Sequence, residues 1–338
     1  MTSAPARSED QLRARIPLLL AGLAVVLVVQ AAFVLSYVGA LHHPRPHHVR
    51  VGVVGASLLP TAVGKQFSLR ITRYPSEAAA RSAIDHRKID GALISGRGGS
   101  TLVVVPAAGT AGAAALSTAF GAAAAALHEQ LEVVQAHPLP AGDASGNVSF
   151  LVVMALIIGG YLASTVATVF AGTATRRGRL AALAVVAVAG ALLTDVFAGP
   201  VYDAVPTSKF FVLWGLFVLV MLAVAYATAA LQTVLGAAGT LVVVVVFVIF
   251  GAPASGGTLP SPYLPGFWRT LGPYLPAGAG TTAVRNTIYF DGNGIVRSLV
   301  VLAAYLVIGA AALIVIRRRR RNVSEAEAEA SAAATIVV

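Results

Sequence analysis

Residues 150–170 read FLVVMALIIGGYLASTVATVF, a run of apolar and small side chains without a charged group. A helix needs about 20 such residues to cross the hydrocarbon core of a bilayer. This run has that length, and similar runs occur on both sides of it in the chain. It therefore predicts a membrane-crossing helix and makes an integral membrane protein the first hypothesis for the chain.

The overall composition agrees with that hypothesis. Apolar residues make up 57% of the 338 residues and charged residues only 11%, whereas about 25% charged is usual in soluble domains. The formal net charge is +10, but the basic residues cluster at the ends of the apolar runs, so membrane orientation explains them better than nucleic acid does. Cysteine is absent, which excludes disulfides and cysteine-based metal sites.

Six segments are predicted to cross the bilayer: Ile16–Tyr37, Phe150–Phe170, Leu180–Phe197, Phe211–Ala230, Val234–Phe250 and Ser298–Ile316. The first is interpreted as an uncleaved anchor, because its apolar run exceeds the roughly 7–15 residues of a signal peptide. A cleaved signal peptide, suggested by Val38 and Ala40, is the alternative. The uncharged stretch Thr110–Leu127 is rich in Ala and Gly, which insert poorly, so we expect it not to cross.

Arginine clusters predict the orientation. They comprise Arg13 and Arg15, then Arg176, Arg177 and Arg179, and finally Arg317 to Arg321. Because short cytoplasmic loops favour positive charge, six crossings place all three clusters on the cytoplasmic face. The excess of Arg over Lys and the abundance of Ala indicate a bacterial source. We therefore expect a protein of the bacterial plasma membrane with both termini in the cytoplasm.

The fold class that follows is an α-helical multi-pass membrane protein, arranged as one helix plus five, with a small extracytoplasmic α/β domain. The expected parts are a cytoplasmic N-terminus (1–15), the first transmembrane helix (16–37), the extracytoplasmic domain (38–149), a five-helix transmembrane domain (150–316) with a broken outer segment (251–294), and a cytoplasmic tail (317–338).

Residues 38–149 carry the patterns of a small α/β domain. Val49–Val54 reads as a buried strand, and apolar residues alternate with polar ones over 67–72. Ser76 is the expected N-cap of a helix. Strands are expected at 90–95 and 101–105 around a glycine turn, followed by an Ala-rich helix from Ala111 to Gln135.

This domain shows little catalytic chemistry. Gly64 and Lys65 lack the spacing and the hydroxyl residue of a phosphate-binding loop. The His-rich tract 42–48 is interpreted as a polar linker, with metal binding as the less favoured alternative. Asp85, His86 and Asp90 are interpreted as a solvated helix end. We therefore expect no enzyme, and no catalytic, cofactor or metal site in this chain.

The predicted spans hold few polar groups. Asp195 is interpreted as a solvated helix end at the outer interface, with a functional role as the alternative. Because ion-coupled carriers keep charged groups inside their spans, this scarcity argues against a transporter that powers itself. Gly160, Ser164 and Thr168 recur every fourth residue, as do Gly236 and Thr240. Such small faces predict helix packing, with a subunit interface or substrate path as the alternative.

Residues 251–290 are rich in Pro, Gly and aromatic side chains and are too broken to cross the membrane. We predict a pair of short helices at or in the outer leaflet, with their rings at the membrane interface. The rings are those of Tyr263, Phe267, Trp268, Tyr274, Tyr289 and Phe290. The candidate residues of this outer interfacial segment are Pro260, Pro265, Phe267, Trp268, Pro276 and Arg285.

This segment resembles the end of type-2 ABC transporter permeases, and more narrowly of YhgE/Pip-like and nitrosoguanidine-resistance-like membrane proteins. The matching residues are SGGTLP at 255–260, LPGFW at 264–268, LP at 275–276 and the pair Val284-Arg285. The layout of one span, an outside domain and five spans is similar too, as is the stretch Tyr74–Ser95.

The resemblance implies a permease half that forms a homodimer or heterodimer and pairs with a separate ATPase subunit, so that ATP acts only through the partner. By position, the ATPase-contact loop would be Thr173–Arg179, with Arg176, Arg177 and Arg179 as its candidate residues; topology alone is the simpler explanation of these arginines. The function expected is export of a hydrophobic or amphipathic compound. The alternative is a non-transporting membrane protein whose outer domain is a scaffold or receptor.

Overall fold

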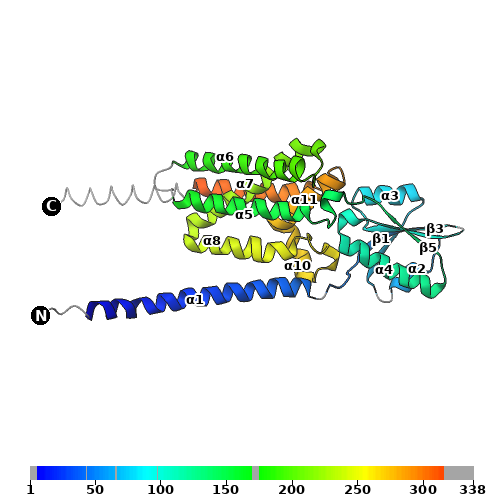
Figure 1. Cartoon of the computed structure of the whole chain (residues 1–338), viewed down its shortest axis with the longest axis horizontal. Coiled ribbons are helices and arrows are strands. Elements are labelled where there is room, and N and C mark those ends of the chain that lie inside the picture. Colours follow the sequence, from blue (N-terminus) through cyan, green and yellow to red (C-terminus); the bar gives the residue numbers. More distant parts are fainter. Residues whose placement is uncertain (1–5, 43, 65–66, 97, 170–174, 316–338) are drawn as a thin grey trace.

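The structure, a computed structural model, describes residues 6–42, 44–64, 67–96, 98–169 and 175–315. Figure 1 shows a helical bundle with a sheet domain at one end of its long axis. The long helices are α1 (Ala6–Leu41), α5 (Val148–Val169), α6 (Arg176–Val196), α7 (Phe210–Leu235), and a last helix over Val296–Val315. Between α7 and the last helix lie α8 (Ala237–Val243) and the π-helical η5 (Val244–Phe250).

Six helices in the described part of the chain are long and apolar enough to cross a membrane: Leu19–Leu41, Thr110–Leu127, Val148–Val169, Arg177–Val201, Thr207–Leu235 and Val296–Val315. A seventh apolar helix, Ala238–Ala254, is shorter. The chain is therefore a multi-pass membrane protein by length and composition of its helices. Five of the six predicted segments coincide with long helices, and the predicted Val234–Phe250 segment falls on the shorter one.

Two helices extend beyond the spans predicted from the sequence. The first helix begins at Ala6 and ends at Leu41, so it contains Arg13 and Arg15 instead of following them. α6 begins at Arg176, with Thr175 Oγ1 accepting a hydrogen bond from Gly178 N at 3.1 Å as its cap. The arginine cluster before the predicted third span is thus the first turn of a helix. Residues 173 and 174 of the predicted ATPase-contact loop lie outside the described part.

The sheet domain has five strands, β1 (Val49–Val54), β2 (Leu69–Arg73), β3 (Gly91–Gly96), β4 (Gly99–Val104) and β5 (Leu131–Gln135), in the order β2-β1-β3-β4-β5. β1 runs parallel to both β2 and β3, β3 and β4 form an antiparallel hairpin, and β4 and β5 are parallel. α2 (Leu59–Gly64) and α4 (Thr110–Leu127) pack on one face, and α3 (Glu77–Asp85) packs on the other.

α4 belongs to this domain although it is apolar enough to cross a membrane. Its Leu116 and Phe120 are fully buried in one cluster with Leu93 of β3 and Leu102 of β4. Burying side chains of this size contributes about 1.5–3 kcal/mol each. α4 therefore supplies one half of the core of the sheet domain.

The elements of the domain follow the predicted order with three differences. The Ala-rich helix ends at Leu127 and not at Gln135, because His128 adopts a left-handed conformation (φ 54°) and residues 131–135 form β5. α2 between β1 and β2 was not predicted, and β2 begins two residues later than the alternation suggested. The Ser76 cap is confirmed, since Ala79 N donates to Ser76 Oγ at 3.2 Å.

The outer segment forms three short helices, not two. They are α9 (Gly251–Ala254), α10 (Gly266–Leu271) and α11 (Pro276–Tyr289), joined by the 3₁₀ turns η6 (Ser261–Tyr263) and η7 (Gly272–Tyr274). α11 is almost completely buried against α5 and α7. The remaining short turns are η1 (Pro106–Ala108), η2 (Ala141–Asp143), the π-helical η3 (Phe197–Val201) and η4 (Thr207–Lys209).

Glycine is required where these short helices meet. A Cβ on Gly272 would overlap the carbonyl oxygen of Ala254, and one on Gly278 would overlap the carbonyl oxygen of Gly272. Both obstacles are backbone atoms, which cannot turn aside as a side chain can. The outer segment therefore packs backbone against backbone at these two positions.

We expect Gly272→Ala to lower the free energy of unfolding by about 1–3 kcal/mol, because the new methyl group must push the α9 backbone away. Thermal unfolding of the purified protein in detergent measures this. Gly121→Ala is the matched control, since Gly121 is on helix α4 with open space around its Cβ position. Equal shifts for the two variants would contradict the packing argument.

Candidate functional site

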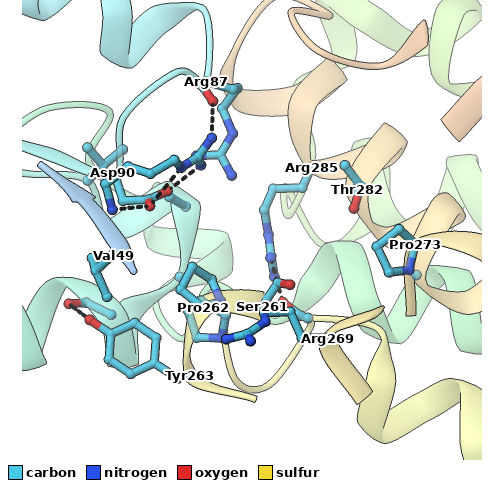
Figure 2. Close-up of a pocket in the computed structure, with 18 of the residues that line it drawn as sticks. Val49, Arg87, Asp90, Ser261, Pro262, Tyr263, Arg269, Pro273, Thr282 and Arg285 are labelled. Atoms are coloured by element: carbon cyan, nitrogen blue, oxygen red, sulfur yellow. Dashed lines mark hydrogen bonds and ion pairs between the residues drawn. The ribbon is translucent and has the colours of Figure 1, made fainter. Parts of the chain in front are cut away.

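A cavity of about 550 Å³ lies where the sheet domain meets the outer segment (Figure 2). Its walls come from the start of β1, from η1 and α4, from the segment between α9 and α11, and from the start of the last helix. Its charged lining consists of Arg50, Arg87, Arg269, Arg285 and Arg297 with a single acid, Asp90. The cavity is therefore strongly cationic.

Asp90 is already engaged by Arg50. Arg50 donates from Nη2 to Asp90 Oδ1 at 2.6 Å and from Nε to Oδ2 at 3.1 Å, and its backbone N donates to the same carboxylate. The interpretation of Asp90 as part of a solvated helix end is therefore wrong, because it is paired with Arg50. Asp85 and His86 are exposed, as expected. The other cations of the cavity face a lining with no further carboxylate among its described residues.

Arg87 follows α3 with a left-handed backbone (φ 60°) that turns its side chain toward the outer segment. Its guanidinium lies over the ring of Phe290, 4.4 Å from the centroid, and its Nη1 is buried without a hydrogen-bond partner among the described residues. Burial lowers the pKa of Arg87 to about 10; Asp90 acts in the opposite direction, while Arg50 and Arg285 lower it further. Arg87 is still charged at neutral pH and is short of anionic partners.

Arg285 is the deepest cation of the site, with an exposed fraction of 6%. It extends from α11 and donates from Nη1 to Gly256 O at 2.8 Å and from Nη2 to Gly257 O at 3.0 Å. Burial lowers its pKa, and the charge of Asp143 partly offsets this. In Figure 2 its side chain lies between Arg87 and Asp90 on one side and Thr282 and Pro273 on the other.

The remaining arginines come from the middle of the outer segment and from the helix that follows it. Arg269, in α10, has a buried Nη1 without a hydrogen-bond partner in the described structure. Arg297, at the start of the last helix, is exposed and lies over the ring of Tyr274, 4.5 Å from its centroid. The guanidinium groups thus reach the cavity from several elements that are distant in sequence.

The rest of the lining mixes apolar and polar side chains. The apolar ones include Val49, Val105, Leu116, Pro260 and Tyr263, and the polar ones include His48, Ser261 and Thr282. Pockets of this size, with apolar walls and a few convergent polar groups, are typical of sites for small molecules. The arrangement can hold an anionic group together with an apolar body.

Three hydrogen bonds join the sheet domain and its flanking segments to the outer segment around the cavity. Tyr263 Oη donates to Gly112 O at 3.2 Å, Tyr289 Oη donates to Asp143 Oδ2 at 2.6 Å, and His47 N donates to Pro262 O at 2.8 Å. The His-rich tract predicted as a linker thus also forms part of the rim.

The candidate residues of the outer interfacial segment divide between several roles. Pro260 and Arg285 line the cavity, Pro265 precedes α10, and Pro276 begins α11. The structure therefore brings two of these candidates into the site.

The predicted interfacial rings divide as well. Trp268 is 7% exposed and stacks on Phe250, and Tyr263 and Phe290 are also buried in protein. Neighbouring elements cover these three rings, and their place at the membrane interface stays a prediction. Phe267 and Tyr274 are exposed, as an interfacial position requires.

Sequence reasoning did not find Arg50, Arg87, Asp90 and Arg297 as site residues. They lie on different elements and fit no local motif. The one signal for these residues is the presence of arginine in stretches expected to lie on the outer side of the membrane. There the orientation rule does not explain positive charge.

The predicted ATPase-contact arginines lie at the end of the bundle opposite the sheet domain, as does Ala6, the first described residue of α1 (Figure 1). Arg177 is exposed, whereas Arg179 is 7% exposed and donates from Nη2 to Thr168 Oγ1 at 2.7 Å. The side chain of Arg176 lies outside what the structure describes. Of the two arginines whose side chains are described, Arg177 is thus the one available to a partner.

Arg179 belongs to a buried polar network centred on Gln232 of α7. Gln232 Oε1 accepts from Ser164 Oγ at 3.0 Å and Thr168 Oγ1 at 2.7 Å, and its Nε2 donates to hydroxyls of α5 and α8. Gly160, one turn before Ser164, packs closely on Met221 and Val224. Gly160, Ser164, Thr168 and Thr240 therefore make contacts within the bundle as predicted, whereas Gly236 is exposed with open space around its Cβ position.

Asp195 is not the solvated helix end that its sequence position suggested. Its exposed fraction is 0%, and neither carboxylate oxygen has a hydrogen-bond partner within the described residues. α6 continues past it into the π-helical η3, so the position is inside a helix. An unpaired buried carboxylate costs stability whether it is ionised or protonated.

Comparison with protein-family models, with curated proteins and with solved structures finds no match to this chain. The site must therefore be interpreted from its own geometry.

We expect Asp195→Asn to raise the unfolding temperature in detergent at neutral pH, because it removes a buried carboxylate without changing the shape of the side chain. A gain of about 1–2 kcal/mol is the expected size. Asp291→Asn is the comparison, since Asp291 is exposed and paired with Lys209. A lower unfolding temperature for Asp195→Asn would show that the carboxylate is needed for stability.

Proposed function

We propose that this chain is the membrane subunit of an exporter of the type-2 ABC kind, which moves a hydrophobic or amphipathic compound with energy from a separate ATPase. In this proposal α4 stays with the sheet domain and Ala238–Ala254 is the fifth crossing. The sheet domain then lies outside the bacterial plasma membrane, and both termini lie in the cytoplasm.

The observation that carries the proposal is the position of the cavity. It is shared between the sheet domain and the outer segment, directly at the end of the helical bundle. Its mixed cationic and apolar lining suits an amphipathic compound that enters or leaves the outer leaflet. The bundle offers no comparable charged path, since Asp195 is the one carboxylate within its described spans.

The scarcity of charge inside the spans also supports an external energy source. Ion-coupled carriers rely on groups that change protonation or bind ions inside the membrane. The network around Gln232 is built from hydroxyl and amide groups, with Arg179 at its end. Such a network suits helix packing better than ion coupling.

The second candidate function is a receptor or scaffold in the envelope. The same cavity favours it, because the site lies beside the bundle and could bind its ligand without any transport. The two functions differ in whether the opposite end of the bundle contacts an ATPase.

Association with an ATPase tests the first proposal. We expect an ATPase subunit to co-purify with the tagged wild-type chain from membranes of the source organism, and Arg177→Glu to reduce its recovery about tenfold, because it reverses an exposed charge at the expected contact. Arg70→Glu, an exposed position on β2, is the control. Absence of any ATPase with the wild type would contradict the exporter and leave the receptor.

Arg179→Gln separates a structural role from a contact role. Because Arg179 donates to Thr168 inside the bundle, we expect this variant to lower the free energy of unfolding by about 1–3 kcal/mol. Arg177→Gln should leave the stability within about 0.5 kcal/mol, as exposed substitutions usually do. Thermal unfolding in detergent measures both, and equal losses would contradict the assignment.

A further inference from the structure

The cavity between the sheet domain and the outer segment has more positive charge than its own residues neutralise. Five arginines line it against one aspartate, and that aspartate is already paired with Arg50. Placing guanidinium groups together in a partly buried space is unfavourable unless an anion joins them.

Two of these arginines each have one terminal nitrogen without a hydrogen-bond partner in the described structure. Arg87 Nη1 and Arg269 Nη1 are both buried without a hydrogen-bond partner among the described residues. Arg87 also senses the positive charges of Arg50 and Arg285. Arg285 cannot turn away, because both of its terminal nitrogens hold glycine carbonyls. The empty donor of Arg87 therefore has a fixed cationic neighbour in Arg285.

We propose that this cavity binds the phosphate group of an amphipathic headgroup. A guanidinium fork matches phosphate oxygens in pairs, and arginines that approach from several directions can serve the several oxygens of a phosphate at once. A carboxylate has fewer acceptor oxygens than a phosphate and can therefore serve fewer arginines from different directions. The described residues of the lining include no lysine, which would act as a point charge without this geometry.

The apolar part of the lining indicates what is attached to the phosphate. Val105, Leu116 and Pro260 offer apolar surface next to the arginines, and the volume of about 550 Å³ exceeds what inorganic phosphate alone would fill. A phosphate linked to glycerol or a similar body with short apolar extensions fits both features. As a binding site this inference stands without an ATPase; as a statement about the exported compound it rests on the proposed function.

The test is a binding titration of the full chain, purified in an uncharged detergent without a partner. Dihexanoyl phosphatidic acid is the main probe, and dihexanoylglycerol is the same molecule without phosphate. Glycerol 3-phosphate represents a soluble phosphate ester, and hexanoate represents a carboxylate. Arg87→Gln and Arg269→Gln each remove an empty donor, while Arg73→Gln removes the same charge from the exposed end of β2.

We expect phosphatidic acid to bind and dihexanoylglycerol not to bind. Arg87→Gln and Arg269→Gln should each weaken phosphatidic acid about tenfold or more, and Arg73→Gln should change it by less than about twofold. Preference for the lipid over glycerol 3-phosphate would support a lipid headgroup, and equal affinity would support a soluble phosphate ester.

Three results would overturn the proposal. They are equal binding of dihexanoylglycerol, binding of hexanoate as tight as that of phosphatidic acid, and equal weakening by Arg73→Gln and Arg87→Gln. Unfolding temperatures of all variants are compared first, and the use of two site variants guards against one of them failing to fold. Failure here leaves ATPase co-purification unaffected, so the two proposals fail separately.

Discussion

Arg285 fixes the arrangement on which the half of the molecule next to the sheet domain depends. Backbone that is not helical or sheet-like must have its polar groups satisfied by protein or water when it lies at membrane depth. Here a single buried guanidinium donates to the carbonyls of Gly256 and Gly257, immediately before the turn that leads to Pro260. Because α11, which carries Arg285, packs on α5 and α7, this contact ties the irregular stretch to the bundle.

The same contact also fixes where the outer segment lies relative to the bundle. The outer segment presents the arginine-lined cavity on one side and buries α11 in the bundle on the other. At the far end, the network around Gln232 links α5, α7 and α8 and holds Arg179 inward, which leaves Arg177 outside. The proposed ligand site and the proposed partner surface thus lie at opposite ends of the same helices.

Much of this fold is predictable because it depends on local patterns. Long apolar runs identify the long helices, and the period of two together with the Ser76 cap identifies most of the sheet domain. His128 shows the limit, since only its left-handed conformation separates α4 from β5. The cavity cannot be predicted from local patterns, because Arg50 and Arg285 are far apart in the chain and only tertiary packing brings them together. The burial of Asp195 and Trp268 is likewise a tertiary effect that the residues next to them in the sequence do not indicate.

The hydrogen bonds that join the two parts of the molecule have a consequence for recognition. Tyr263, Tyr289 and the backbone of His47 hold the walls of the cavity in place through contacts that do not involve a ligand. The site is therefore preorganised, and a ligand that enters it loses little free energy to the ordering of loops and side chains. If the cavity binds as proposed, we expect discrimination to depend on its fixed shape and charge, and compounds of another shape to be excluded without rearrangement of its walls.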